Sequence, residues 1–248
     1  MQCFASIPSG SCGAATSIAL SGGNMISGDR LDALDPVKLE ILKKITPSYG
    51  EAAVPVDLFD ADIPTTFALR VQRPFAEWSV VALFNPDLER DAVRCFPLRR
   101  LGLDASQSYL AFDFWKQRFV GKVDDELRVK VAPGSVTLLA LHAATGRPQL
   151  LSTSRHVTQG GVEIEDVQWH AAARSLRGVS TGPAGSAHDV FVHVPGDHPW
   201  TWGGRHMLYR DGPGYSSKLV DSSVMRVHVR FENETRVPWQ IDFSDLLE

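Results

Sequence analysis

Two serines and a histidine lie close together in the sequence and could supply a nucleophile with its base. If Ser152, Ser154 and His156 lie on one strand, their side chains share one face of it. A serine nucleophile also needs an acid that orients the histidine and an oxyanion hole. The sequence contains no Gly-x-Ser-x-Gly elbow, the turn that presents such a serine in many hydrolases. We therefore expect these side chains to make hydrogen bonds at a strand edge.

Four histidines crowd a second region, at His188, His193, His198 and His206. Histidine is a common metal ligand, but the ligands of one ion must converge on one point. A spacing of five residues places successive histidines on opposite faces of a strand. No HExxH motif or Cys/His set supports them. We expect surface or loop histidines and predict no metal ion and no other cofactor.

Two indole side chains, Trp200 and Trp202, lie just before a pair of glycines. Exposed indoles can stack on a sugar ring. Tryptophan also fills the core where two sheets meet, and both interpretations stay open. Asn233 begins an N-glycosylation pattern, although nothing else in the sequence indicates secretion.

A series of short elements near the N-terminus ends on a single carboxylate. The small residues at 13–21 predict a short helix, two glycines then predict a tight turn, and residues 24–28 predict a short buried strand. Asp29 would stand at the C-terminal tip of that strand. It could face an active site, or it could only cap the next turn, as aspartate often does.

A second helix is expected after this strand. Asp35 is a suitable N-cap, Pro36 suits the first helical position, and apolar residues from Val37 to Ile45 give the helix one buried face. A helix–strand–helix unit is typical of a (β/α)8 barrel, whose active site lies at the strand tips. A whole barrel needs about 250 residues, and no second unit follows. We interpret residues 1–50 as the C-terminal remnant of such a barrel.

After about residue 50 the apolar periodicity becomes close to two, which predicts strands. The expected strands are 54–59, 65–72, 78–84, 91–98, 109–115, 127–131, 135–142, 148–153, 162–169, 189–194, 206–210, 223–231 and 237–243. Many short strands without intervening helices indicate an antiparallel β-sandwich. We therefore predict a mainly β fold, with a sandwich over residues 51–248.

The composition excludes several classes of partner. A net charge of -4 and a pI near 6.1 give no electrostatic footprint for nucleic acid or an anionic membrane. The apolar runs are far shorter than the ~20 residues that span a bilayer, so we expect a soluble protein. Residues 1–28 carry no charge but are interrupted by Pro8 and several glycines, which argues against a signal peptide and slightly favours the cytoplasm over secretion. Cys3, Cys12 and Cys95 form no metal or disulfide pattern, and we expect free thiols.

Three parts of the chain carry a family resemblance. They are the run from Phe4 to Asp29, the segment Trp-Ser-Val-Val-Ala-Leu-Phe-Asn at 78–85, and the segment from Pro148 to Gly161. In this order they resemble the last two barrel strands and two segments of the C-terminal β-sandwich of clan D glycoside hydrolases. That clan includes the α-galactosidases and raffinose-synthase-like proteins of families 27 and 36.

The resemblance implies a retaining mechanism with two aspartates, a nucleophile on barrel strand 4 and an acid/base on strand 6. No residue of this chain matches either of them, so we predict no catalytic residue here and expect the chain alone to be inactive. The resemblance also implies that Asp29 lines the sugar pocket. Gly28 occupies a position where relatives often carry a different residue, and Arg30 could neutralise the charge of Asp29 locally.

Two functions follow from these patterns. The chain could be the C-terminal part of a retaining α-glycosidase, acting on α-galactosides by hydrolysis or transfer, with carbohydrate as the partner of the complete enzyme. The alternative is a free-standing β-sandwich that binds carbohydrate or is structural. Sugar specificity and oligomeric state are not predicted, because loops on the other barrel strands set the specificity.

Overall fold

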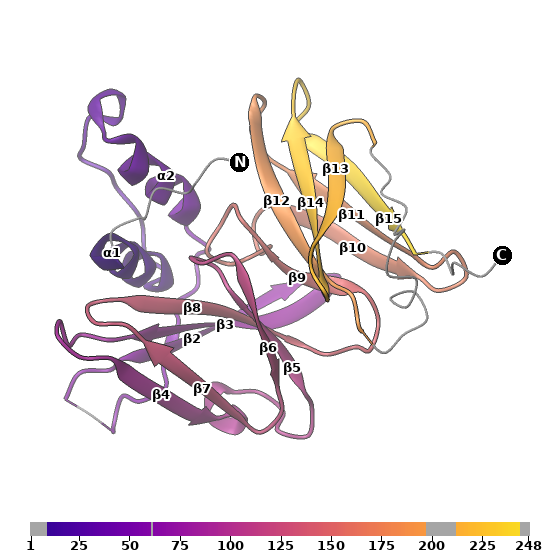
Figure 1. Ribbon diagram of the computed structural model, residues 1–248. Helices are drawn as coiled ribbons and strands as arrows, with labels where there is room; N and C mark the ends of the chain where they lie inside the picture. The colour runs from indigo at the N-terminus through magenta and orange to yellow at the C-terminus, as the bar shows by residue number, and fades with distance from the viewer. Residues whose placement is uncertain (1–8, 61, 197–211, 244–248) are drawn as a thin grey trace. The chain divides into compact units, whose positions relative to one another are not determined.

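The computed structural model describes residues 9–60, 62–196 and 212–243 (Figure 1). They form antiparallel sheets with two α-helices near the N-terminus, which confirms the mainly β fold. The chain divides into two compact units. The first unit contains the helices, most strands up to Ala143, and His156–Thr158. The second unit contains Gln72–Glu77, Ala144–Arg155 and the chain from Gln159 onward.

A six-stranded sheet forms the centre of the first unit. Its strands, in spatial order, are β1 (Val54–Pro55), β2 (Thr66–Arg73), β3 (Ala76–Phe84), β8 (Val136–Ala143), β5 (Tyr109–Asp113) and β6 (Arg118–Val123). A second sheet pairs β4 (Ala92–Pro97) with β7 (Glu126–Val131). Alternate residues of the central strands, such as Val81 and Leu139, share one hydrophobic core with Phe96 and Leu127 of the smaller sheet. The two sheets thus form a β-sandwich.

Two helices and two 3-10 turns complete the first unit: α1 (Ser9–Leu20), η1 (Leu31–Ala33), α2 (Pro36–Ile45) and η2 (Leu98–Leu101). The predicted start of α2 is confirmed, because the Asp35 side chain accepts hydrogen bonds from the backbone N–H groups of Val37 and Lys38. The first helix begins earlier than the predicted residue 13. None of the helices in the described ranges is long and apolar enough to cross a membrane.

The helices cover the second face of the central strands. The indole Nε1 of Trp115 donates a hydrogen bond of 3.0 Å to the hydroxyl of Thr16 in α1. The ammonium group of Lys44 in α2 lies 5.2 Å from the centre of the Phe114 ring, and its carbonyl accepts from the N–H of Val157. Both helices belong to the first unit, so the described residues before 50 and the central strands form one compact unit. The boundary near residue 50 stays a prediction.

The prediction of a buried strand at residues 24–28 is wrong. These residues lie in an extended, irregular segment, and the side chain of Ile26 is 92% exposed. A barrel strand needs hydrogen-bonded neighbours on both sides. No described strand pairs with this segment. The pattern of apolar residues was therefore insufficient to form a strand in this chain.

The second unit is a sandwich of two sheets. One contains β13 (Tyr215–Asp221), β14 (Val224–Phe231), β12 (Ser186–His193) and β9 (Gln149–Thr153) in that order. The other contains β10 (Ile164–His170), β11 (Ser175–Thr181) and β15 (Arg236–Asp242). Both contribute to one hydrophobic core, in which Val190, Val227 and Trp239 are buried.

Most of the expected strands are present. Three further strands of the structure were not predicted, and one expected strand could not be checked. The missed strands are β6, β11 and β13, which carry many glycine, serine, lysine and arginine residues and so show weak apolar alternation. The expected strand at 54–59 is reduced to Val54–Pro55. The expected strand at 206–210 lies outside the described residues.

Candidate functional site

Asp29 follows the extended segment after α1 and is exposed. Its backbone N–H donates to Ser27 Oγ at 3.4 Å, but its carboxylate makes no contact with another described residue. Arg30 does not neutralise it, because the Arg30 guanidinium pairs with Asp32 at 2.7 Å. The following turn, η1, has Arg30 as its N-cap and receives no side-chain cap within the described structure. Among the described residues, the Asp29 carboxylate therefore neither caps a helix nor forms an ion pair.

The two tryptophans predicted as a sugar platform, Trp200 and Trp202, lie outside the described residues, as do His198 and His206. Asn233 is exposed between β14 and β15. Cys12 and Cys95 are free thiols, as expected, and Cys3 lies outside the described ranges.

Ser152, Ser154 and His156 are each engaged in a different hydrogen bond. The hydroxyl of Ser152 donates to the Gln159 side chain at 2.8 Å, and the hydroxyl of Ser154 accepts from the Asp189 N–H at 2.9 Å. His156 Nε2 lies 2.9 Å from the Pro47 carbonyl, which can only accept, so this nitrogen carries the proton. The imidazole is therefore fixed by the backbone and is not presented to a serine as a base.

The first two histidines of the cluster lie on β12 and face opposite sides, as the spacing predicts. The expectation of a surface or loop position is wrong for His188, which faces the core of the second unit. Its Nε2 lies 3.1 Å from Ser180 Oγ, which also accepts from the Trp239 indole at 3.1 Å. Burial, with the positive charges of Arg155 and His228, lowers the pKa of His188 to about 3. In the described ranges, no three His, Cys, Asp or Glu side chains are arranged to hold a metal.

Other buried titratable groups of the first unit serve packing. Burial raises the pKa of the Cys12 thiol to about 11, although the positive charge of Lys44 acts to lower it. The thiol is therefore not a thiolate at neutral pH. Burial also raises the pKa of Asp113, although hydrogen bonds from Lys116 and its positive charge act to lower it. Asp113 accepts from the Lys116 N–H at 3.2 Å and so closes a turn. Neither group is arranged as a nucleophile or acid facing solvent.

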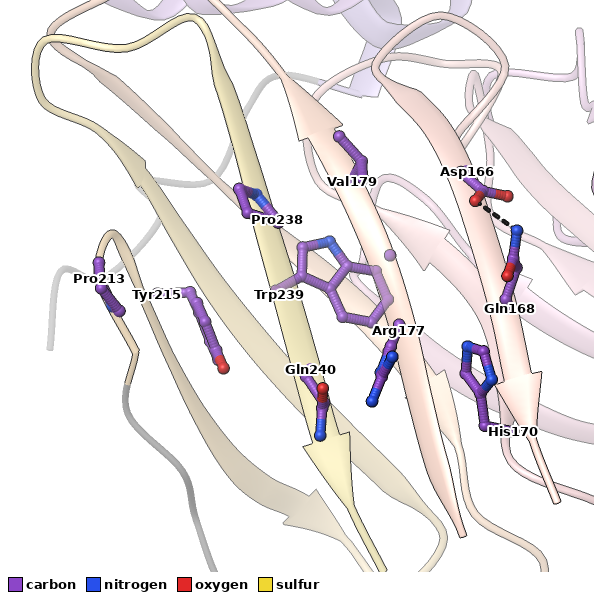
Figure 2. A pocket seen from close by; sticks show the side chains of 11 residues that line it. Asp166, Gln168, His170, Arg177, Val179, Pro213, Tyr215, Pro238, Trp239 and Gln240 are labelled. Carbon is purple, nitrogen blue, oxygen red and sulfur yellow. Dashed lines mark hydrogen bonds between the residues drawn. The ribbon is translucent and has the colours of Figure 1, made fainter. Parts of the chain in front are cut away.

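A groove of about 530 Å³ lies on the second unit, and its residues were not predicted from the sequence. It is lined mainly by outward side chains of β10, β11 and β15 (Figure 2). We call it the outer groove and define it by Asp166, Gln168, His170, Arg177 and Gln240, with Val179 and Pro238 beside them. The alternation of β10 and β15 indicates one polar face on each strand. The sequence does not indicate that the two strands flank β11.

Comparison with known proteins finds a family match for part of the first unit. Residues 74–141 match the family model of the alpha galactosidase C-terminal beta sandwich domain. No curated protein matches the chain. This match spans β3 to β8 within the first unit, apart from the first residues of β3.

Several solved structures are similar to this chain over about half of its length. Alpha-galactosidase I from Mortierella vinacea is 14% identical, with a TM-score of 0.41, over 54% of this chain and 35% of that chain. A GH27 β-L-arabinopyranosidase from Geobacillus stearothermophilus is 16% identical, with a TM-score of 0.42, over 56% and 31%. A variant of the latter in complex with arabinose is 22% identical, with a TM-score of 0.36, over 46% and 26%. The chain therefore spans about a third or less of the length of these proteins.

Proposed function

We propose that the chain is the C-terminal part of a retaining α-glycosidase, because residues 74–141 match the family model of the alpha galactosidase C-terminal beta sandwich domain. The observation that carries this proposal is the family match over the central strands of the first unit. In the proposed enzyme this sandwich follows a (β/α)8 barrel, and the substrate is an α-galactoside, which is hydrolysed or whose sugar is transferred.

A retaining glycosidase needs two carboxyl groups about 5 Å apart, one as nucleophile and one as acid/base. We assign both to barrel strands that precede the residues of this chain. The properties of three buried carboxyl groups support this assignment. Asp57 accepts hydrogen bonds from the N–H groups of Thr65 and Thr66 in the first unit. Asp113 closes a turn in the first unit, and Glu163 accepts from the Thr153 hydroxyl and the Val162 N–H in the second. Each is held by neighbouring groups and is removed from solvent.

Asp29 is the residue that we propose to contact the sugar. Its carboxylate is exposed and has no partner among the described residues, so it can accept hydrogen bonds from hydroxyl groups. A charge-assisted hydrogen bond of this kind contributes roughly 1.5–3 kcal/mol. The same charge can bias the protonation of a neighbouring catalytic carboxyl pair.

We expect Asp29→Asn in the complete enzyme to lower kcat/KM by about ten- to hundredfold, because it removes that charge-assisted hydrogen bond. The melting temperature should be unchanged, since the carboxylate makes no internal contact. Asp32→Asn is the matched control: it removes a neighbouring exposed carboxylate that is paired with Arg30, and kcat/KM should be unchanged. Unchanged kinetics of Asp29→Asn with a lower melting temperature would assign Asp29 a structural role instead.

The purified chain alone is expected not to hydrolyse 4-nitrophenyl α-D-galactopyranoside, because one carboxylate cannot both attack the sugar and protonate the leaving group. Release of nitrophenol is measured against buffer, with an active α-galactosidase as the positive control. Turnover that disappears when a carboxylate of this chain is replaced would place the catalytic pair within the chain and contradict the proposal.

A free-standing carbohydrate-binding sandwich is the second candidate function. The outer groove of the second unit favours it, because this groove presents polar side chains that are suited to sugar hydroxyls. The two candidates differ in whether a barrel is encoded together with this chain.

A further inference from the structure

We propose that the outer groove binds a neutral pyranose through Arg177 and the two glutamines that flank it. This site deepens the second candidate function, because it names the groove and the class of sugar, and it is independent of the α-glycosidase proposal, because it lies on the second unit and needs no catalytic group. Only the choice of an α-galactoside as the first sugar to test rests on the proposed function.

The three side chains form one row across three strands. The register pairs Gln168 of β10 with Arg177 of β11, and Arg177 with Gln240 of β15. Their neighbours along the strands face the core, so all three point to the opposite face of the sheet. Figure 2 labels the three side chains on their adjacent strands. Adjacent strands lie about 4.8 Å apart. Two neighbouring members of the row can therefore reach two neighbouring hydroxyl groups of one sugar ring.

The hydrogen bonds within the groove leave a defined set of free atoms. Gln168 Nε2 donates to Asp166 Oδ2 at 2.8 Å, and Gln240 Nε2 donates to Asp242 Oδ1. These bonds orient both amides and leave their carbonyl oxygens available as acceptors. The guanidinium of Arg177 has no hydrogen-bond or ion-pair partner among the described residues. The row therefore presents, in order, the side-chain oxygen of Gln168 as an acceptor, the N–H groups of Arg177 as donors, and the side-chain oxygen of Gln240 as an acceptor.

This order fits vicinal hydroxyl groups, because each hydroxyl donates one hydrogen bond and can accept others through its two lone pairs. The charges of the groove disfavour an anion. The carboxylates of Asp166 and Asp242 lie beside Gln168 and Gln240, whose amides they accept from, and these glutamines pair with Arg177 on either side. A carboxylate or phosphate at Arg177 would face these oxygens on both sides. The electrostatics thus favour a neutral polyhydroxylated ligand.

An apolar row lies next to the polar one. Val179 of β11 pairs with Pro238 of β15, two residues along each strand from Arg177 and Gln240. Pro238 is exposed and Val179 is half-buried, so together they offer a surface to the C–H groups of a sugar ring. The groove is within the size range of small-ligand sites, about 300–1,000 Å³. Polar and apolar rows side by side match the two kinds of surface on a pyranose.

The proposal is tested by titrating the isotope-labelled full chain with neutral sugars and following its amide and side-chain NMR signals. The probes are melibiose, which ends in an α-galactosyl residue, cellobiose, and galacturonate as an anionic analogue. Saturable shifts are expected for β10, β11 and β15 with melibiose. In Arg177→Met the Kd should rise at least about tenfold, because a charge-assisted hydrogen bond is lost.

Arg230→Met is the matched control, since Arg230 is also an exposed strand arginine of the second unit, on the other sheet. Its Kd for melibiose should equal that of the parent chain. Dispersed spectra of both variants show that they are folded. Binding of cellobiose alone, lost in Arg177→Met, would support the groove as a neutral sugar site and remove the galactoside assignment. The proposal is overturned by the absence of saturable shifts with both neutral sugars, by binding that Arg177→Met leaves unchanged, or by tighter binding of galacturonate.

Discussion

Replacing Gly178 by alanine is expected to lower the free energy of unfolding of the second unit by about 3 kcal/mol. A Cβ on Gly178 would lie 2.1 Å from Cζ2 of Trp239, far inside van der Waals contact. The indole cannot easily move, because it is 2% exposed within the core and donates a hydrogen bond to Ser180. Amide exchange in β11 and β15 measures the loss of stability in this unit.

Two further variants make this prediction specific. Gly196→Ala serves as the control, because a Cβ there meets no atom within 4 Å, and its stability should be close to that of the parent chain. In a Trp239→Ala background the indole is absent, so adding Gly178→Ala should cost much less than it does alone. A loss below about 1 kcal/mol for Gly178→Ala in the parent chain would show that the indole does not rest on this glycine.

Acidification is expected to destabilise the second unit through His188. The pKa of His188 is about 3 in the folded chain and near 6.5 when unfolded. Between these values the unfolded state binds one proton more, so stability falls as the pH falls from about 6.5 toward 3. The slope is expected to approach about 1.4 kcal/mol per pH unit once the pH is well below the unfolded pKa, which amounts to roughly 2 kcal/mol between pH 6.5 and 4.5. Denaturant unfolding at a series of pH values measures it.

His188→Gln should flatten this profile by about one proton, because the glutamine oxygen can still accept from Ser180 but does not titrate. His170→Gln, which makes the same substitution at a histidine of the outer groove, is the matched control. If His188→Gln retained the full slope, the acid sensitivity would originate from other groups.

The sequence predicted those helices and strands that are determined by residues close together in the chain. The Asp35–Pro36 pair predicted the start of α2, because an N-cap acts on its own first turn. The apolar runs of β3 and β8 predicted central strands, and both strands are almost wholly buried. The family resemblance at 78–85 lies within the later family match.

Features that depend on distant partners could not be predicted in this way. Residues 24–28 have a strand-like sequence, but strand formation requires neighbours that the described chain does not provide. The burial of His188 depends on Ser180 and Trp239, which come from two other strands. The row in the outer groove likewise depends on the register of three strands. No local pattern contains that register.

The role of Asp29 stays a prediction, and its structural setting explains why the sequence alone left it open. A strand-tip position was inferred from residues 24–28, which form no strand here. The capping alternative receives no support from η1, whose N-cap is Arg30. The Asp29 carboxylate has no partner among the described residues, and the kinetics of Asp29→Asn in the complete enzyme test its role.

The central claim is that this chain is the C-terminal part of an α-galactosidase-like glycoside hydrolase. Mapping the 5′ end of the transcript that encodes it tests this claim most directly. The account predicts that the reading frame continues upstream of Met1 and encodes the earlier βα units of a barrel, with aspartates at the tips of strands 4 and 6. A transcript with an in-frame stop codon directly before Met1 would contradict the claim and leave a free-standing sandwich.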